Sequence, residues 1–199
     1  MVKLPEIAID FDEENHIYSL RGMRLPSVTQ LMRPMTTMVY GDVSPSTLNA
    51  AADRGTRVHQ SVENIVKYGV EEWDEDTELY VMAFQQFQRD YGKKWLGSEY
   101  RVYHEVMNYA GTIDLIAQAG DDAVDVIDIK TTTAFHGILL SCQLSAYAEA
   151  LRSHGVNVHE IYGLQLLNNG TYRFERVDYD YKLFMHSMAL CNAMAKAGY

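Results

Sequence analysis

The stretch YAGTIDLIAQAGDDAVDVIDIKTTT, residues 109–133, contains two apolar, β-branched runs joined by a Gly-Asp-Asp turn. This pattern predicts a β-hairpin made of two core strands. Three charged residues interrupt the runs: Asp114 in the first, and Asp128 and Lys130 in the second. Because an unpaired charge among Ile, Val and Leu is costly to bury, we expect these three side chains to have a role other than packing.

The spacing of the charges indicates what that role is. Asp128 and Lys130 are two residues apart on one strand, so they face the same side, about 7 Å apart. If Asp114 on the partner strand faces the same way, the three groups converge. Two close carboxylates repel each other unless a cation lies between them, and an oxygen-rich site of this kind suits Mg²⁺ or Mn²⁺. The alternative is a structural ion pair of Lys130 with either aspartate at the end of a sheet. Gly111 interrupts the first strand, which indicates a bulge or the close approach of another backbone or a ligand.

Length and composition set wider bounds. The 199 residues, 47% hydrophobic and 22% charged, predict one globular domain. The formal net charge of −10 argues against extensive duplex binding, though not against a local nucleic-acid site. Cys142 and Cys191 are too few for a disulfide framework. No apolar run approaches the ~20 residues of a membrane span, and no signal peptide is evident, so we expect a cytoplasmic location without membrane association.

Periodicity and turn signals predict an α/β domain, with a central mixed β-sheet flanked by helices on both faces. We divide it into an N-terminal extension, 1–45, and a core, 46–199. The predicted elements are, in order, a hairpin within 7–20, a short helix to Leu31, an irregular segment 33–45, a helix from Ser44 or Ser46 to about Tyr68, a helix 75–91, strands 98–107, 110–118 and 123–130, a helix 138–153, a hairpin of 159–167 and 171–177, and a helix 179–197.

The segment RGTRVHQSVE, residues 54–63, carries polar residues on an otherwise amphipathic helix. Gly55 costs about 1 kcal/mol relative to alanine inside a helix, so it indicates a packing or ligand requirement. His59 and Glu63 are four apart and share a face. His59 is either a ligand or a satisfied histidine at the border of the core. Arg54 and Arg57 either hold a phosphate or offset nearby acidic residues.

Four short motifs occur in order along the chain: GTRVH (55–59), GTID (111–114), DIK (128–130) and QLSAY (143–147). Together they resemble the G-x-x-x-H, G-x-x-D, D-x-K and Q-x-x-x-Y motifs of the PD-(D/E)XK nuclease superfamily, in its RecB-like exonuclease branch. The segments 16–32 and 102–116 are similar to phage exonucleases and the mitochondrial genome maintenance exonuclease. The resemblance extends over about residues 16–167, with Ile113 in place of the proline of the superfamily's name. It implies a restriction-endonuclease-like core.

The resemblance also implies roles for individual residues. His59, Asp114, Asp128 and the backbone carbonyl of Ile129 would be metal ligands, and Lys130 the catalytic lysine. Gln143, Tyr147 and Glu99 would support the site or contact the nucleic-acid strand. The alternatives are ordinary helix surface for Gln143, core packing for Tyr147 and an exposed strand carboxylate for Glu99.

The function implied is a Mg²⁺- or Mn²⁺-dependent deoxyribonuclease. We expect an exonuclease acting on DNA ends or single strands in phage-type replication, recombination or repair, in a bacterial or phage-infected cell. Tyr147 and Tyr109 are candidates for stacking on unpaired bases. The two cysteines imply no iron–sulfur cluster, and without a Walker motif any ATPase activity would belong to a recombination or replication partner. The alternatives are a flap- or junction-selective endonuclease and a catalytically silent DNA-binding subunit.

Overall fold

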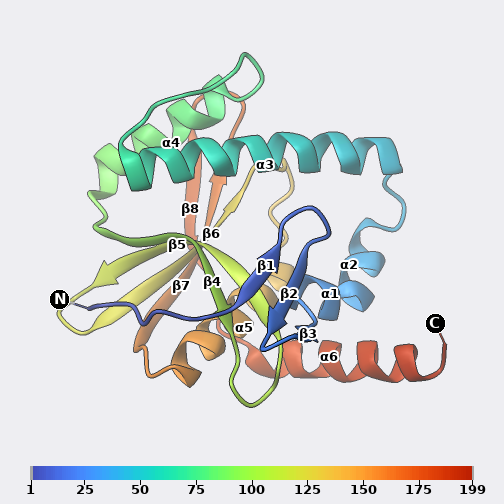
Figure 1. The fold of residues 1–199 in the computed structure, drawn as a ribbon. Helices are drawn as coiled ribbons and strands as arrows, with labels where there is room; N and C mark the ends of the chain where they lie inside the picture. Colours follow the sequence, from blue (N-terminus) through green and yellow to red (C-terminus); the bar gives the residue numbers. More distant parts are fainter. Residues whose placement is uncertain (1, 199) are drawn as a thin grey trace.

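A five-stranded mixed sheet forms the centre of the protein, which the computed structural model describes from residue 2 to residue 198 (Figure 1). Its strand order is β4-β5-β6-β7-β8, with β6 and β7 parallel and the other neighbours antiparallel. The strands are β4 (Trp95–Tyr103), β5 (Ala110–Ala119), β6 (Ala123–Lys130), β7 (Val158–Leu166) and β8 (Tyr172–Arg176). The parallel pair requires a crossover, which α5 (Gly137–Ser153) provides.

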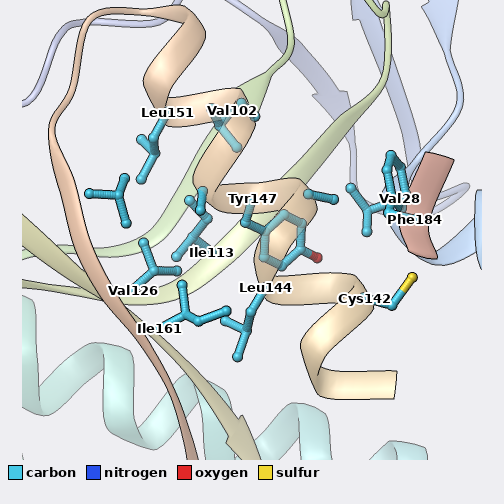
Figure 2. Close-up of a cluster of buried hydrophobic side chains, with 14 of the residues drawn as sticks. Val28, Val102, Ile113, Val126, Cys142, Leu144, Tyr147, Leu151, Ile161 and Phe184 are labelled. Carbon is cyan, nitrogen blue, oxygen red and sulfur yellow. The ribbon is translucent and has the colours of Figure 1, made fainter. Parts of the chain in front are cut away.

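Helices cover both faces of this sheet (Figure 1). On one face lie α3 (Pro45–Tyr68) and α4 (Glu78–Tyr91), and on the other lie α5 and α6 (Tyr181–Lys196). Each face has its own apolar core. Figure 2 shows the core beneath α5, where Leu144 and Leu151 meet residues of the sheet such as Ile113 and Val126. The second core joins α3 and α4 to the sheet through the fully buried Phe84 and Phe87, among others.

The strands β4 and β5 exchange faces at one point. Ile113 packs in the core beneath α5, whereas Leu115 packs in the core beneath α3 and α4. Residues two apart on a regular strand share a face, so β5 must turn over at Asp114. In β4, Ser98 pairs with Leu115 and Tyr100 with Ile113, which places Glu99 across from Asp114. Glu99 has a φ of 48°, a left-handed conformation that is unusual for this residue and reverses the alternation of β4 at the same place.

The N-terminal extension is a small sheet and two helices attached to β5. It contains β1 (Asp10–Asp12), β2 (Ile17–Leu20), β3 (Met23–Leu25), α1 (Val28–Leu31) and α2 (Arg33–Tyr40). The amide of Ala110 donates to the carbonyl of Pro26 at 3.0 Å, and the hydroxyls of Tyr18 and Thr112 lie 2.8 Å apart. These bonds fix the small sheet beside Asp114.

The prediction that residues 33–45 are irregular is wrong for α2. Pro34 lies in the first turn of that helix, where its missing N–H has no intrahelical partner to lose. On α4 the aromatic side chains of Tyr80, Phe84 and Phe87 are buried, whereas Tyr91 at the helix end is 49% exposed. Within residues 2–198 no helix is long and apolar enough to cross a lipid bilayer.

Candidate active site

Three side chains from three different elements converge where β4 and β5 change faces. His59 of α3, Glu99 of β4 and Asp114 of β5 each offer a ligand atom, and these atoms all lie within 4.8 Å of one another. Nδ1 of His59 lies 3.5 Å from Glu99 Oε1 and 3.6 Å from Asp114 Oδ1. All three side chains are partly buried. The group has the nitrogen and oxygen donors that divalent metals accept from proteins.

The backbone of Ile129 connects this group to the neighbouring strand β6. Its amide donates to Oδ2 of Asp114 at 2.6 Å, and its carbonyl oxygen lies 3.3 Å from Nε2 of His59. The carbonyl therefore contacts the ring nitrogen of His59 that does not face the two carboxylates.

Asp128 and Lys130 form a second pair on β6, next to the first group. Nζ of Lys130 lies 2.6 Å from Oδ2 of Asp128, a carboxylate that is almost completely buried. Within residues 2–198, neither oxygen of Asp128 accepts a hydrogen bond of good geometry. Lys130 also donates to Gln143 Oε1 at 3.4 Å, and Gln143 donates to the hydroxyl of Tyr147 at 3.2 Å. The contact between Asp128 and Lys130 confirms the prediction that their side chains face the same side of β6.

The distribution of carboxylates differs from the sequence expectation. The expected ligands were His59, Asp114 and Asp128, whereas the structure groups Glu99 with His59 and Asp114. Asp128 lies outside that group and contacts Lys130. Its two buried oxygens accept no hydrogen bond of good geometry in the described chain, so Asp128 remains a candidate ligand.

The charges of the site affect one another strongly. Burial opposes protonation of His59, but Asp114 and Glu99 outweigh it and raise its pKa to about 9. Burial raises the pKa of Asp114, and His59 offsets only part of the rise. Burial also raises the pKa of Asp128, to about 6, despite the adjacent Lys130. For Lys130, burial is outweighed by Asp128 and Asp114, and its pKa is raised. Excess negative charge held out of water is the condition under which a cation binds.

Both glycines that the sequence singled out lie near this site. A Cβ on Gly111 would stand 2.5 Å from Cε1 of Tyr147, so the close approach predicted there is that of an aromatic ring. A Cβ on Gly55 would stand 3.6 Å from Oγ1 of Thr131, an ordinary contact, so no steric requirement explains this glycine.

Other predicted residues are occupied elsewhere. Arg57 donates to Asp74 at 2.5 Å and to Asp76 at 3.2 Å, which favours the alternative that it offsets local acid. The guanidinium of Arg54 lies 5.5 Å from the ring centre of Tyr80, and its buried Nε has no hydrogen-bond partner in the described chain.

The two tyrosines expected to stack on bases do not have exposed rings. Tyr109 is fully buried, and its hydroxyl donates to the carbonyl of Ala146 at 2.9 Å. Tyr147 is 5% exposed and its ring lies against Gly111, so its core-packing alternative describes most of the side chain. Burial therefore contradicts the expectation of base stacking for Tyr109, and Tyr147, although it lines the groove, exposes too little of its surface to offer a stacking face.

The cluster of His59, Glu99 and Asp114 lies in a groove of about 1120 Å³. One wall is α3, the opposite wall is the N-terminal segment with β1 and β2, and the floor is β4 and β5. A smaller hollow of about 250 Å³ adjoins it at His59 and reaches Lys130 and Thr131. The groove exceeds the ~300–1,000 Å³ typical of small-molecule pockets, which suits a polymeric substrate.

Comparison with known proteins agrees with this arrangement. The model of the PD-(D/E)XK nuclease superfamily matches residues 41–172, so the chain belongs to that superfamily. Its mixed sheet flanked by helices is the restriction-endonuclease-like core that the sequence predicted. No curated protein sequence matches the chain.

Solved structures are similar at low identity. The structure of SSO0001 has a TM-score of 0.51 and 14% identity, over 88% of this chain and 78% of that one, and it shares the fold. An alkaline exonuclease (LHK-Exo) from Laribacter hongkongensis has a TM-score of 0.44 and 13% identity over 86% of each chain. Its complex with dAMP has a TM-score of 0.41 and 14% identity, over 87% of this chain and 89% of that one.

Proposed function

We propose that the protein is a divalent-metal-dependent deoxyribonuclease that removes nucleotides from DNA ends or single strands. The observation that carries the proposal is the convergence of His59, Glu99 and Asp114 within 4.8 Å of one another, beside the buried pair of Asp128 and Lys130. The order of the four sequence motifs supports the same assignment. The proposed site lies on the floor of a groove of about 1120 Å³.

The residues present fit a hard divalent cation such as Mg²⁺ or Mn²⁺. The carboxylates of Asp114 and Glu99 supply oxygen donors, and His59 supplies a nitrogen that Mn²⁺ accepts more readily than Mg²⁺. Oδ2 of Asp128 lies beside the ammonium of Lys130, but the buried Oδ1 contacts no donor in the described chain, which is costly unless a cation or a water lies beside it. We assign His59, Glu99, Asp114 and the carbonyl of Ile129 as metal ligands, with Asp128 completing the site. When bound, the metal would supply Lewis-acid activation of the scissile phosphate.

Lys130 is proposed as the catalytic residue. Its ammonium is held between Asp128 and Gln143, at 2.6 and 3.4 Å, so it cannot rotate freely away from the site. A fixed positive charge stabilises the negative charge that develops on phosphate during hydrolysis. Gln143 positions Lys130, and Tyr147 in turn positions Gln143 through their hydrogen bond.

Preference for ends or single strands is supported by the charge of the protein. A net charge of −10 does not favour long contacts along a duplex, where affinity depends on many lysines and arginines. Water would attack in line with the leaving oxygen and leave a 5′-phosphate and a 3′-hydroxyl. The biological setting that we infer is DNA replication, recombination or repair.

The proposal is tested by a time course on oligonucleotides labelled at the 5′ or the 3′ end, single- or double-stranded, with Mg²⁺, Mn²⁺ or EDTA. We expect cleavage with metal, none with EDTA, and loss of at least ~10²-fold in rate for Lys130→Ala and Asp114→Ala. Lys182→Ala, which removes an exposed lysine on α6, is the control and should cleave like the wild type. Near wild-type cleavage by either site variant would refute the assignment.

Covalently closed single-stranded DNA separates the two kinds of nuclease. An exonuclease leaves the circle intact while it degrades the linear form of the same sequence. Cleavage of the circle at a comparable rate would replace the exonuclease with an endonuclease of the same chemistry.

A further inference from the structure

Three aromatic rings line the groove on the side of the N-terminal sheet. Phe11 stacks on Tyr18 with ring centres 4.5 Å apart and an interplanar angle of 30°. His16 stands edge-on to both rings, at 5.2 Å from Phe11 and 5.6 Å from Tyr18. All three belong to the lining of the groove that contains His59, Glu99 and Asp114. Unlike Tyr109 and Tyr147, Phe11 is only half-buried and His16 is exposed.

The hairpin that carries these rings is held rigidly beside the proposed metal site. Tyr18 is 2% exposed, and its hydroxyl lies 2.8 Å from Oγ1 of Thr112, two residues before Asp114. The turn between β1 and β2 is closed by Asp12, whose carboxylate accepts from the amide and the side chain of Asn15 at 3.1 and 2.8 Å. His16 follows this turn with a φ of 51°. The rings are therefore ordered before any ligand binds, which lowers the entropy cost of stacking.

An arginine lies over the ring of Phe11. The guanidinium carbon of Arg101 is 4.9 Å from the ring centre of Phe11, and its Nη2 donates to Oε1 of Glu13 at 2.9 Å. Both partners of this ion pair are exposed, so the pair contributes little to stability and exchanges readily. Arg101 is thus an available cation next to an aromatic surface.

The charges of the groove exclude a binding mode that depends on phosphate contacts alone. Its lining holds five carboxylates, Glu6, Glu13, Glu63, Glu99 and Asp114. Apart from histidines, its cations are Lys67 and Arg101, and Lys67 is already paired with Glu63. A strand held in this groove must therefore gain much of its affinity from its bases.

We propose that Phe11, His16 and Arg101 form a clamp for one unpaired nucleotide of the DNA strand that enters the site. Arg101 leaves Glu13 and the ring of Phe11 for a phosphate of the strand, and the base stacks on the Phe11 ring with its edge against His16. In a duplex, base faces are covered by neighbouring pairs, so the clamp selects single-stranded DNA. This inference rests on the proposed function, because it assigns the specificity of the same site.

The experiment measures binding without cleavage. A fluorescently labelled single-stranded oligonucleotide is titrated with protein in EDTA and followed by anisotropy. Phe11→Ala should bind roughly 5- to 150-fold more weakly than the wild type, the range for loss of one stacked base. Phe11→Leu keeps an apolar side chain for the hairpin but no π-face, and it should lose most of the same affinity. Tyr179→Ala, an exposed aromatic outside the groove that also contacts an arginine, should bind like the wild type.

The salt dependence of binding tests Arg101. The slope of the logarithm of affinity against that of salt concentration should fall by about 0.7 in Arg101→Ala, the value for one phosphate contact on a single strand. Arg176→Ala removes an exposed arginine paired with Glu160 outside the groove and should leave the slope unchanged. The fluorescence of a 2-aminopurine base in the oligonucleotide should be quenched by the wild type and not by either Phe11 variant.

The outcomes separate the clamp from the nuclease proposal. If the wild type cleaves DNA but both Phe11 variants bind single strands as tightly as it does, the clamp is refuted and the nuclease stands. If binding depends on Phe11 but no metal supports cleavage, the clamp stands and the proposed function fails. Equal loss of affinity for duplex and single-stranded DNA would also refute the clamp, since a stacked unpaired base is its only source of selection.

Discussion

Gly111 and Tyr147 are in direct contact: a Cβ at position 111 would stand 2.5 Å from the ring carbon Cε1 of Tyr147 and 3.3 Å from Cζ. The contact matters beyond packing because the hydroxyl of Tyr147 accepts a hydrogen bond from Gln143. Gln143 in turn accepts one from Lys130. The missing side chain of Gly111 therefore affects the position of the proposed catalytic ammonium through two intervening residues, Tyr147 and Gln143.

Gly111→Ala should lower both stability and activity. The added methyl group has no space unless the ring of Tyr147 moves, and overpacking of this kind costs about 1–3 kcal/mol of unfolding free energy. Because the displaced ring carries Gln143 with it, we expect the cleavage rate to fall by about tenfold or more at temperatures where the variant is folded. Urea denaturation and initial cleavage rates measure the two effects.

Gly137→Ala, at the start of α5 with no heavy atom within 4 Å of the added Cβ, is the matched control and should be neutral or slightly stabilising. A fully active Gly111→Ala would show that the ring does not position Lys130.

Glu99 provides a test of the metal ligands that is independent of catalysis. Glu99→Gly should reduce the affinity for Mn²⁺ by about 10- to 100-fold or more, measured by calorimetry. It should not unfold the protein, because glycine adopts the φ of 48° without strain and the substitution removes a carboxylate facing Asp114. Glu175→Gly removes an exposed carboxylate on β8 and controls for charge. Unchanged Mn²⁺ affinity in Glu99→Gly, with loss in Asp128→Asn, would restore the ligand set expected from the sequence.

Metal binding should strengthen with rising pH. In the metal-free protein the pKa of His59 is about 9, so a metal that binds its nitrogen must displace a proton at neutral pH. We expect Mn²⁺ affinity to rise by up to about tenfold per pH unit between pH 7 and 9, and less steeply above. Calorimetry in buffers of different ionisation enthalpy counts the released proton. His59→Gln should flatten the dependence, whereas His186→Gln, on the exposed side of α6, should not.

The same titration predicts an opposite trend for the stability of the metal-free protein. Because the folded pKa of His59 is raised above the ordinary value of 6.5, its stabilising contribution is complete below pH 6.5. The contribution is lost as the pH rises through about 9. Denaturation in EDTA across this range should show the loss in the wild type and not in His59→Gln. A rise in stability over that interval would contradict the charge assignment.

Lys130→Ala should destabilise the protein in a pH-dependent way. Its removal leaves the carboxylate of Asp128 buried without a counter-charge, which we expect to cost about 3 kcal/mol at pH 8, at the lower end of the range because Lys130 is partly exposed. The pKa of Asp128, about 6 beside Lys130, would rise further. Since a raised carboxylate pKa gives stability that is lost as pH rises, the deficit should be small near pH 5 and grow toward pH 8. Lys130→Ala combined with Asp128→Asn should recover stability at pH 8 without recovering cleavage. A deficit that does not vary with pH would indicate a packing effect instead.

Much of the fold is predictable from the sequence because its elements have strong local signals. The segment from Ala110 to Lys130 has two apolar runs joined by a turn, and the structure has the strands β5 and β6 there. The long helix around His59 begins after Ser44, whose side chain accepts from the amide of Thr47, and ends at Gly69 in a left-handed conformation. Both signals are local, so one sequence is enough to find them.

The parts that could not be predicted depend on contacts between distant residues. Whether Arg57 binds a phosphate or pairs with nearby carboxylates depends on Asp74 and Asp76. These two residues come beside Arg57 only when the segment after α3 is folded. Glu99 joins the site because of the register between β4 and β5 and because of its own left-handed backbone, neither of which has a sequence signature. Tyr109 and Tyr147 have the right residue type for base stacking, but the core that buries them is formed by other segments.

The exchange of faces in β4 and β5 separates the proposed metal-binding side chains from the residues that form the two apolar cores. Neighbouring positions of these strands, such as Ile113 and Leu115, belong to one of the two apolar cores, and a substitution there alters packing. Glu99 and Asp114 lie where the two strands change faces, and neither side chain is part of an apolar core. Substitutions of Glu99 and Asp114 can therefore change the proposed metal-binding side chains while both apolar cores stay intact. The ligands of the site can evolve separately from the fold.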